Sequence, residues 1–456
     1  MKMNRIIPFI LLMLLSVSGA AQDSTAIVSV SPDSTHAKAK VNHFTLGMSL
    51  MARGEIRDGG FPADPEAEHP TDRSGMIIGR ARLVLGYDRP YIAARVSAQY
   101  VGAWGDGSTN AFNLHEAWAK LTSRQGLFLQ FGRQALSYDD ERIIGPDDWT
   151  MAGNKHDALR MGYEGHGHKV HILAAYNQNI GNLDAGTTFF AKGAMPYKTM
   201  QTLWYHYDLP VFPFGFSVLA MNIGLQAGEK GKNEHMEWQQ LVGAYVTCSS
   251  KYCHLDASYY HQFGHVETGL PVNAFMASVK AQIQPSPIYG FTLGYDYLSG
   301  DDYIAVLQEG AMGLPQHKVI KGFNPVYGSH HKFYGAMDFF YVSSFHHDFS
   351  PGLQNAFAGV EVHPVKGLDI AASYHYMAAT TDMREHDGSL INKTLGHMAE
   401  VEASYRFLKF CSVSAGFTYM GGTQTMQRLK CASSDGRLYW GWLSLIVSPD
   451  IVDVKW

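Results

Sequence analysis

Apolar and polar residues alternate along nearly the whole chain after residue 41, in stretches on the order of ten residues. Alternation with a period of two is typical of β-strands that have one apolar and one polar face. Two kinds of connection, short turns and longer polar segments, follow each other between these stretches. The pattern predicts an all-β fold, a transmembrane antiparallel β-barrel whose strands present apolar side chains to lipid.

The connections set the expected number of strands. Short turns fall at residues 88–90, 124–126, 165–167, 210–213, 249–252, 285–287, 365–367 and 408–409. Longer segments cover residues 53–74, 137–156, 181–196, 300–330, 379–393 and 420–437. Bacterial outer-membrane barrels have short periplasmic turns and long extracellular loops, so eight turns with both termini on the inner side predict about 18 strands.

The start of the chain indicates export. Lys2 and Arg5 precede a short apolar run over residues 6–17, and small residues follow it before Gln22. This order is typical of a cleaved secretory signal peptide, which we place at residues 1–21. Residues 22–40 show no periodicity and are expected to form a flexible periplasmic lead-in, and residues 41–456 to form one barrel domain.

Composition agrees with a lipid-facing surface. Charged residues make up 17% of the chain, below the ~25% of an average soluble domain, while Gly and aromatic residues are abundant. A soluble β-propeller shares that abundance but would repeat every ~40 residues, and no such repeat is found. The formal net charge of −5 gives no reason to expect a nucleic-acid partner.

Alternate residues of a strand face opposite sides, and this parity of odd and even positions predicts which side chains face the interior. In residues 76–88, Ile77, Leu83 and Leu85 suit lipid, which turns Arg80 and Arg82 inward. The same test on the following strands gives an inward set of Arg95, Glu116, Lys120 and Arg160. Arg133 is a further candidate, although either parity of its strand leaves Phe128 or Phe131 in an unfavourable position.

We refer to Arg80, Arg82, Arg95, Lys120, Arg133 and Arg160 as the basic band. Arg and Lys side chains that line a pore select anions, and the guanidinium fork can hold a carboxylate by two parallel hydrogen bonds. The alternative is that these residues only form salt bridges with lumenal acids such as Glu116, Asp157 and Glu164. The band would then stabilise the wall without selecting a solute.

The most distinctive sequence motif of the chain lies around residues 132–160. It runs Gly132-Arg133-Gln134, Tyr138-Asp139-Asp140-Glu141-Arg142, Gly145, Asp148-Trp149 and Asp157-Ala158-Leu159-Arg160. In this order the chain resembles the alginate-export family of outer-membrane porins, and Gly322-Phe323-Asn324-Pro325 is similar to a second family segment. The resemblance implies an 18-stranded barrel whose arginine-lined pore passes an acidic exopolysaccharide outward.

The acidic loop after Arg133 has its own physical interpretations. Its acids, with Arg142 and Trp149, could fold inward as a constriction in which Trp149 offers a ring face to a sugar. They could equally lie in an external loop, solvated or binding divalent ions at the lipopolysaccharide surface.

Other candidate chemistry is sparse. Cys248 and Cys253 flank a predicted inner turn, so a disulfide between them is an open alternative, whereas Cys411 and Cys431 are not expected to pair. The histidine pairs, such as His330 and His331, lack zinc-binding spacing, and no cofactor is expected. His254 near Ser258 resembles a hydrolase pair on a barrel's outer face, but the chain is not expected to be an enzyme.

The end of the chain and its external loops suggest partners. Pro449 interrupts the last alternating run, and Val452, Val454 and Trp456 resume an outward apolar set that resembles a signal for the barrel-assembly machinery. Outer-membrane lipid, lipopolysaccharide, anionic solutes and a periplasmic export scaffold are the other expected partners of a monomer. The rival hypothesis is a barrel plugged by residues 300–330 that serves as an anchor or adhesin.

Overall fold

The structure is a computed structural model that describes residues 41–59, 73–106, 111–191, 193, 195–301, 319–338, 340, 350–385, 387–430 and 437–456. The predicted signal peptide and lead-in therefore lie outside the described residues, as does Cys431. No helix among the described residues is long and apolar enough to cross a membrane.

The chain is folded almost entirely into β-strands. Their bounds are β1 His43–Asp58, β2 Arg73–Arg89, β3 Ile92–Ala103, β4 Ala111–Thr122, β5 Leu127–Gln134, β6 His156–Gly165, β7 His168–Tyr176, β8 Thr199–Asp208, β9 Phe214–Ala227, β10 His235–Ser249, β11 Cys253–His265, β12 Pro271–Ile283, β13 Tyr289–Leu298, β14 Leu353–Val365, β15 Leu368–Ala378, β16 Thr394–Leu408, β17 Cys411–Gly422, β18 Arg437–Val447 and β19 Asp450–Lys455. The short helices are α1 Asn182–Ala185, η3 His330–Lys332 and α3 Gln424–Lys430.

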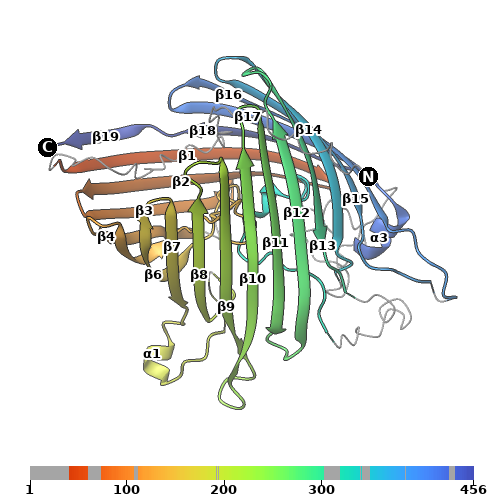
Figure 1. Cartoon of the computed structure of the whole chain (residues 1–456), viewed down its shortest axis with the longest axis horizontal. Helices are drawn as coiled ribbons and strands as arrows, with labels where there is room; N and C mark the ends of the chain where they lie inside the picture. The colour runs from red at the N-terminus through yellow and green to blue at the C-terminus, as the bar shows by residue number, and fades with distance from the viewer. Residues whose placement is uncertain are drawn as a thin grey trace, which may run out of the picture.

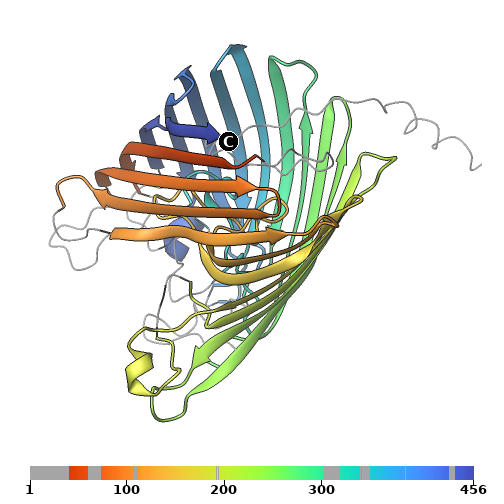
Figure 2. The same cartoon turned by 90° about the vertical axis from the view of Figure 1, so that its left-hand side faces the viewer.

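The strands close into one antiparallel barrel. From β1 to β18 each strand pairs with the next one in the sequence, and β1 pairs with β2 on one side and with both β18 and β19 on the other. In Figure 2 the red N-terminal strand accordingly lies beside the blue C-terminal strands. β18 and β19 meet successive parts of β1 and form one interrupted strand, so the 19 segments make the predicted 18-stranded barrel.

The eight predicted short turns join β2 to β3, β4 to β5 and so on to β16 and β17. The longer connections, which include α1 and α3, gather at the opposite end of the barrel (Figure 1). Because short turns are periplasmic in outer-membrane barrels, this arrangement predicts that the end with α1 and α3 is extracellular.

Strand alternation separates the two faces. In β2, Leu83 and Leu85 lie exposed on the outer face while Arg80 and Arg82 are buried inside. One predicted boundary is wrong, because residues 53–58 continue β1 instead of starting a loop. Arg53 and Arg57 thereby join the inward face, while Ile56 is exposed on the outer face.

The interior is not uniformly polar. Two loop segments, residues 135–155 and 319–338, pack against inward apolar side chains such as Met200, Leu219 and Leu241 in one buried cluster. The loops also join each other, because Ile144 and Tyr327 form a parallel bridge and Gly145 donates a backbone hydrogen bond to Tyr327. Strand alternation alone predicts a polar lumen and does not reveal this core.

Candidate functional site

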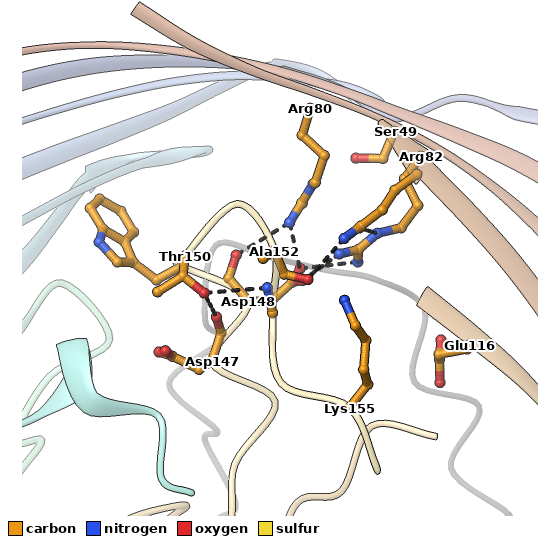
Figure 3. Close-up of polar contacts among 12 residues, drawn as sticks. Ser49, Arg80, Arg82, Glu116, Asp147, Asp148, Thr150, Ala152 and Lys155 are labelled. Atoms are coloured by element: carbon orange, nitrogen blue, oxygen red, sulfur yellow. Dashed lines mark hydrogen bonds and ion pairs between the residues drawn. The ribbon is translucent and has the colours of Figure 1, made fainter. Parts of the chain in front are cut away.

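Asp148 of the inserted loop binds the two central arginines of the basic band. Arg80 donates from Nη1 to Asp148 Oδ1 at 3.1 Å, and Arg82 donates from Nη2 to the same oxygen at 2.8 Å. Arg80 also reaches the backbone oxygen of Asp148 at 3.3 Å. Figure 3 shows both guanidiniums converging from the barrel wall on this one carboxylate. Strand β2 thus presents a carboxylate-binding pair to the interior.

The neighbouring cations of the band also face acids. Arg95 on β3 lies 2.9 Å from Glu116 on β4, and Lys120 lies 4.0 Å from Glu164. Both acids are inward-facing, as the sequence analysis proposed for them. In the pairing of β3 with β4, a bulge at residues 114–116 changes which alternate side chains of β4 face inward. After the bulge, Glu116 and Lys120 both face inward.

Arg160 stands beside Lys120 over an aromatic ring. Its Nη2 donates to Gln130 Oε1 at 2.6 Å, and its Nε has no hydrogen-bond partner. Lys120 Nζ and Arg160 Cζ lie 4.3 and 5.5 Å from the centre of the Phe128 ring. The inward position of Phe128 therefore places a cation–π surface in the wall, which resolves the ambiguous parity of β5.

Arg133 does not belong to the band. It shares its parity on β5 with Leu127, Leu129 and Phe131, which are exposed on the outer face. Its Nη2 lies 2.7 Å from Asp157, whose side chain is 47% exposed. The prediction that Arg133 and Asp157 face the lumen is wrong, because the inward parity of β5 is taken by Phe128, Gln130 and Gln134.

Arg142 is a buried ion that borders the interior cavity and is held by structural contacts. Its guanidinium donates to Tyr334 and Ser278, lies 3.1 Å from Asp296 and 3.2 Å from Asp140, and has the Phe333 ring 4.1 Å away. With its side chain 2% exposed, its donors join loop 135–155, loop 319–338 and the barrel wall.

Trp149 is likewise committed to packing. Its ring stacks on His331 with centroids 4.0 Å apart, the Arg53 guanidinium lies 4.2 Å over it, and Trp442 meets it edge-on. The loop therefore folds inward, as one interpretation of the sequence predicted. These contacts contradict the idea that Trp149 offers a free ring face to a sugar.

The sequence analysis missed two cations near Asp148. Arg53 donates to the backbone oxygen of Trp149 at 2.9 Å, and Lys155 donates to Asn113 at 3.3 Å while pointing toward the Asp148 cluster in Figure 3. Alternation in residues 50–58 could have revealed Arg53. Lys155 follows no strand pattern, so only the fold of the loop could place it.

A cavity of about 1130 Å³ borders this site. On one side it is lined by Arg82, Arg95, Glu116, Asp148 and other residues of loop 135–155. On the other side, strands β13–β17 supply the acids Asp296, Glu361, Glu400 and Glu402. The interior therefore has a basic wall along β2 and β3 and an acidic wall opposite it.

Asp147, a cavity-lining acid next to Asp148 in the loop, has a perturbed pKa. Burial, together with the nearby Asp338 carboxylate, raises the pKa of Asp147 to about 6. Its Oδ1 is buried and has no hydrogen-bond partner. It is therefore charged at neutral pH but close to its titration point.

The remaining sequence candidates do not form sites. Cys248 and Cys253 are free thiols. Ser258 is buried on the inward face, and His254 bonds Ser249 at 2.7 Å, so the two do not form an outer-face pair. Within the described ranges, no three His, Cys, Asp or Glu side chains gather as a metal site.

The solved structures similar to this chain include outer-membrane porins. No protein-family profile and no curated protein sequence matches the chain. Pseudomonas aeruginosa OpdL is similar with a TM-score of 0.59 at 11% identity, covering 90% of this chain and 99% of its own. P. aeruginosa OccK2 (OpdF), solved in complex with glucuronate, has a TM-score of 0.57 at 11% identity, covering 90% and 98%. Acinetobacter baumannii OccAB1 has a TM-score of 0.56 at 11% identity, covering 90% and 97%.

Fold and interior together define the class. The chain has the β-barrel fold of the Gram-negative outer-membrane porins. The resemblance to the alginate-export family remains a prediction from the sequence.

Proposed function

We propose that the protein is a passive outer-membrane channel that admits anionic solutes along its basic wall. The observation that carries this proposal is the pair of short contacts, 2.8 and 3.1 Å, by which Arg82 and Arg80 hold the carboxylate of Asp148. Such charge-assisted bonds are what a carboxylate solute needs in order to leave water. Arg95, Lys120 and Arg160 would continue the same wall, and no cofactor is required.

The substrate class that we propose is sugar acids. Each uronate ring carries one carboxylate for the arginines and hydroxyls for the polar groups around them. OccK2, which has the same fold, was solved with glucuronate. An acidic polysaccharide of the alginate type, to which the sequence resemblance points, consists of such rings. Its passage would need a periplasmic scaffold to deliver the polymer, whereas a monomer would diffuse alone.

Liposome swelling tests the substrate class. Vesicles with the refolded protein are exposed to glucuronate, glucose or short alginate oligosaccharides of matched osmolarity. The proposal predicts faster swelling with glucuronate than with glucose, and swelling with oligosaccharides only if the polymer also passes. Equal rates for glucuronate and glucose would contradict anion preference.

A matched pair of variants tests the wall itself. Arg95→Gln with Lys120→Gln removes two inward cations and should reduce glucuronate uptake. Arg133→Gln removes a cation from the outer face and should leave uptake unchanged. If the outer-face variant lost as much uptake as the inner one, the wall would not be the route.

The plugged barrel is a second candidate because of one observation, although residues 302–318 of the predicted plug lie outside the described residues. Residues 135–155 and 319–338 are joined in the interior and packed into an apolar cluster with inward strand residues. A barrel filled in this way would act as an anchor or adhesin through its external loops. Folded protein that gives no conductance and no swelling with any solute would favour this role.

A further inference from the structure

Asp148 occupies the position that a bound solute carboxylate would take. Arg82 grips both of its oxygens, at 2.8 Å for Oδ1 and 3.4 Å for Oδ2, and Arg80 shares Oδ1. Among the ion pairs of the described residues, Asp148 is the one acid of the loop that pairs with these arginines. The chain has thus placed its own carboxylate in its anion site.

Burial makes this pairing hard to break without a replacement. The side chains of Arg80 and Arg82 are only 3% and 2% exposed. Withdrawal of Asp148 alone would leave two buried guanidiniums without a carboxylate, and such unpaired buried charges are strongly unfavourable. Exchange of Asp148 for another carboxylate keeps both arginines paired, so an arriving anion removes most of the obstacle to loop movement.

The site can be reached from the cavity. Asp148 retains 13% side-chain exposure, and both Asp148 and Arg82 line the cavity. Arg80 Nε is buried without a hydrogen-bond partner, which leaves a spare donor for an incoming acceptor. A solute carboxylate therefore has a path to Arg82 and Asp148, and Arg80 holds a donor beside them that Asp148 does not use.

The two halves of the loop are held differently. The first half is fixed by Arg142 and by the bridge from Ile144 to Tyr327. The second half meets the β1–β3 wall through Asp148 and two backbone contacts, Arg53 to Trp149 at 2.9 Å and Gln99 to Ala152 at 2.8 Å. It also meets loop 319–338, because Trp149 stacks on His331 and because Asp147 and Asn154 donate hydrogen bonds to that loop. The Asp148 ion pairs are the charged contacts of this segment with the wall, so their loss would loosen residues 147–154 against the wall while the first half stays in place.

We propose that Asp148 is an internal surrogate of the solute carboxylate, and that a carboxylate solute displaces it from Arg80 and Arg82 and so releases residues 147–154. This inference rests on the proposed function, because it deepens the account of the same anion site. Neutral sugars cannot take over the two charges and leave the loop closed. Selectivity then comes from the exchange as well as from the charge of the wall.

Hydrogen exchange of the loop amides directly tests whether a solute displaces Asp148. Backbone amides of Thr150, Gly153 and Asn154 are held by bonds to Asp147, Thr150 and Pro146 within the loop. Detergent-folded wild-type protein is labelled in glucuronate, in glucose and in potassium chloride of equal ionic strength. We expect severalfold faster exchange of these amides in glucuronate only. Simple ligand binding without displacement would slow them instead.

Two variants with the same loss of charge sharpen the test. Asp148→Asn removes the surrogate and should show fast exchange without any solute. Asp147→Asn removes the neighbouring carboxylate, which forms no ion pair with Arg80 or Arg82, and should behave as the wild type. Equal behaviour of the two variants would overturn the proposal. If Asp148→Asn fails to fold, Arg80→Gln keeps the Arg82 pair and should give intermediate exchange, and unchanged exchange there would also overturn it.

Conductance recorded on the same samples separates this inference from the function. Channels that carry glucuronate with unchanged or slower loop exchange would overturn the displacement of Asp148 and leave the channel function standing. Faster exchange in glucuronate without any current would support displacement and contradict the channel.

Discussion

At the scale of single residues, the cations of the interior divide into two groups. Arg142 has two acids, a tyrosine and a serine around it and serves the loop structure. Arg80 and Arg82 share one carboxylate between them, so positive charge remains at that point of the wall. The two groups should therefore respond differently to substitution.

Substitution of Arg142 tests the structural group. Arg142→Gln leaves Asp140 and Asp296 without their cation in a buried site, so the free energy of unfolding should fall by about 3–5 kcal/mol. The measurement is equilibrium unfolding of the folded barrel in lipid or detergent. Arg133→Gln, which breaks a partly exposed pair, should change it by less than about 1 kcal/mol. A similar loss in both variants would contradict a special role for Arg142.

The ionisation of Asp147 predicts a pH response of the cavity. Because its pKa is raised to about 6, the group is negative at pH 7 and becomes neutral as the pH falls to 5. Loss of one negative charge beside the basic wall should increase anion preference over this interval. Reversal potentials at pH 7 and pH 5 measure it, and Asp147→Asn should remove this part of the response. A shift toward cations on acidification would contradict the assignment.

Parity predicted the inward residues Arg80, Arg82, Arg95, Glu116, Lys120 and Arg160, because lipid fixes the opposite face of each strand. It did not predict their partner Asp148. That contact spans 66 or 68 residues and depends on how an irregular loop folds into the barrel. Arg133 was misassigned because Phe128 faces inward, where it contacts Lys120 and Arg160 of the neighbouring strands. The sequence of β5 alone does not show these contacts.

At the scale of elements, turns were the strongest sequence signal and loops the weakest. All eight short turns join neighbouring strands as predicted, since Gly, Pro and polar residues interrupt the alternation there. The end of β1 was missed because Arg53, Glu55 and Arg57 look like loop residues until their inward parity is known. Strands such as β9, apolar on both faces around residues 218–223, indicate an interior core that simple barrel patterning does not anticipate.

The turn between β10 and β11 gives a prediction about thiols. Cys248 pairs with Leu255 in the ladder, so Cys253 is its diagonal neighbour at ~7–8 Å, too far for a disulfide. Both thiols should react with maleimide in unreduced, folded protein, giving a mass increase on each. A Cys248 to Cys253 linked peptide in the unreduced digest would contradict this register.

At the scale of the whole molecule, closure of the barrel was predictable and the filling of its interior was not. The even strand number follows from turns and termini, and β18 with β19 completes it despite Pro449. The interior combines a basic wall, an acidic wall and two joined loops. In the proposed channel, the charge balance along the wall, rather than the net charge of the chain, determines which solutes pass.

The most direct test of the account is the reversal potential of the folded mature protein in a planar bilayer under a potassium chloride gradient. The basic wall predicts open channels that prefer chloride over potassium, with weaker preference after Arg95→Gln and Lys120→Gln. Preference for potassium would contradict the anion channel while leaving the barrel fold in place.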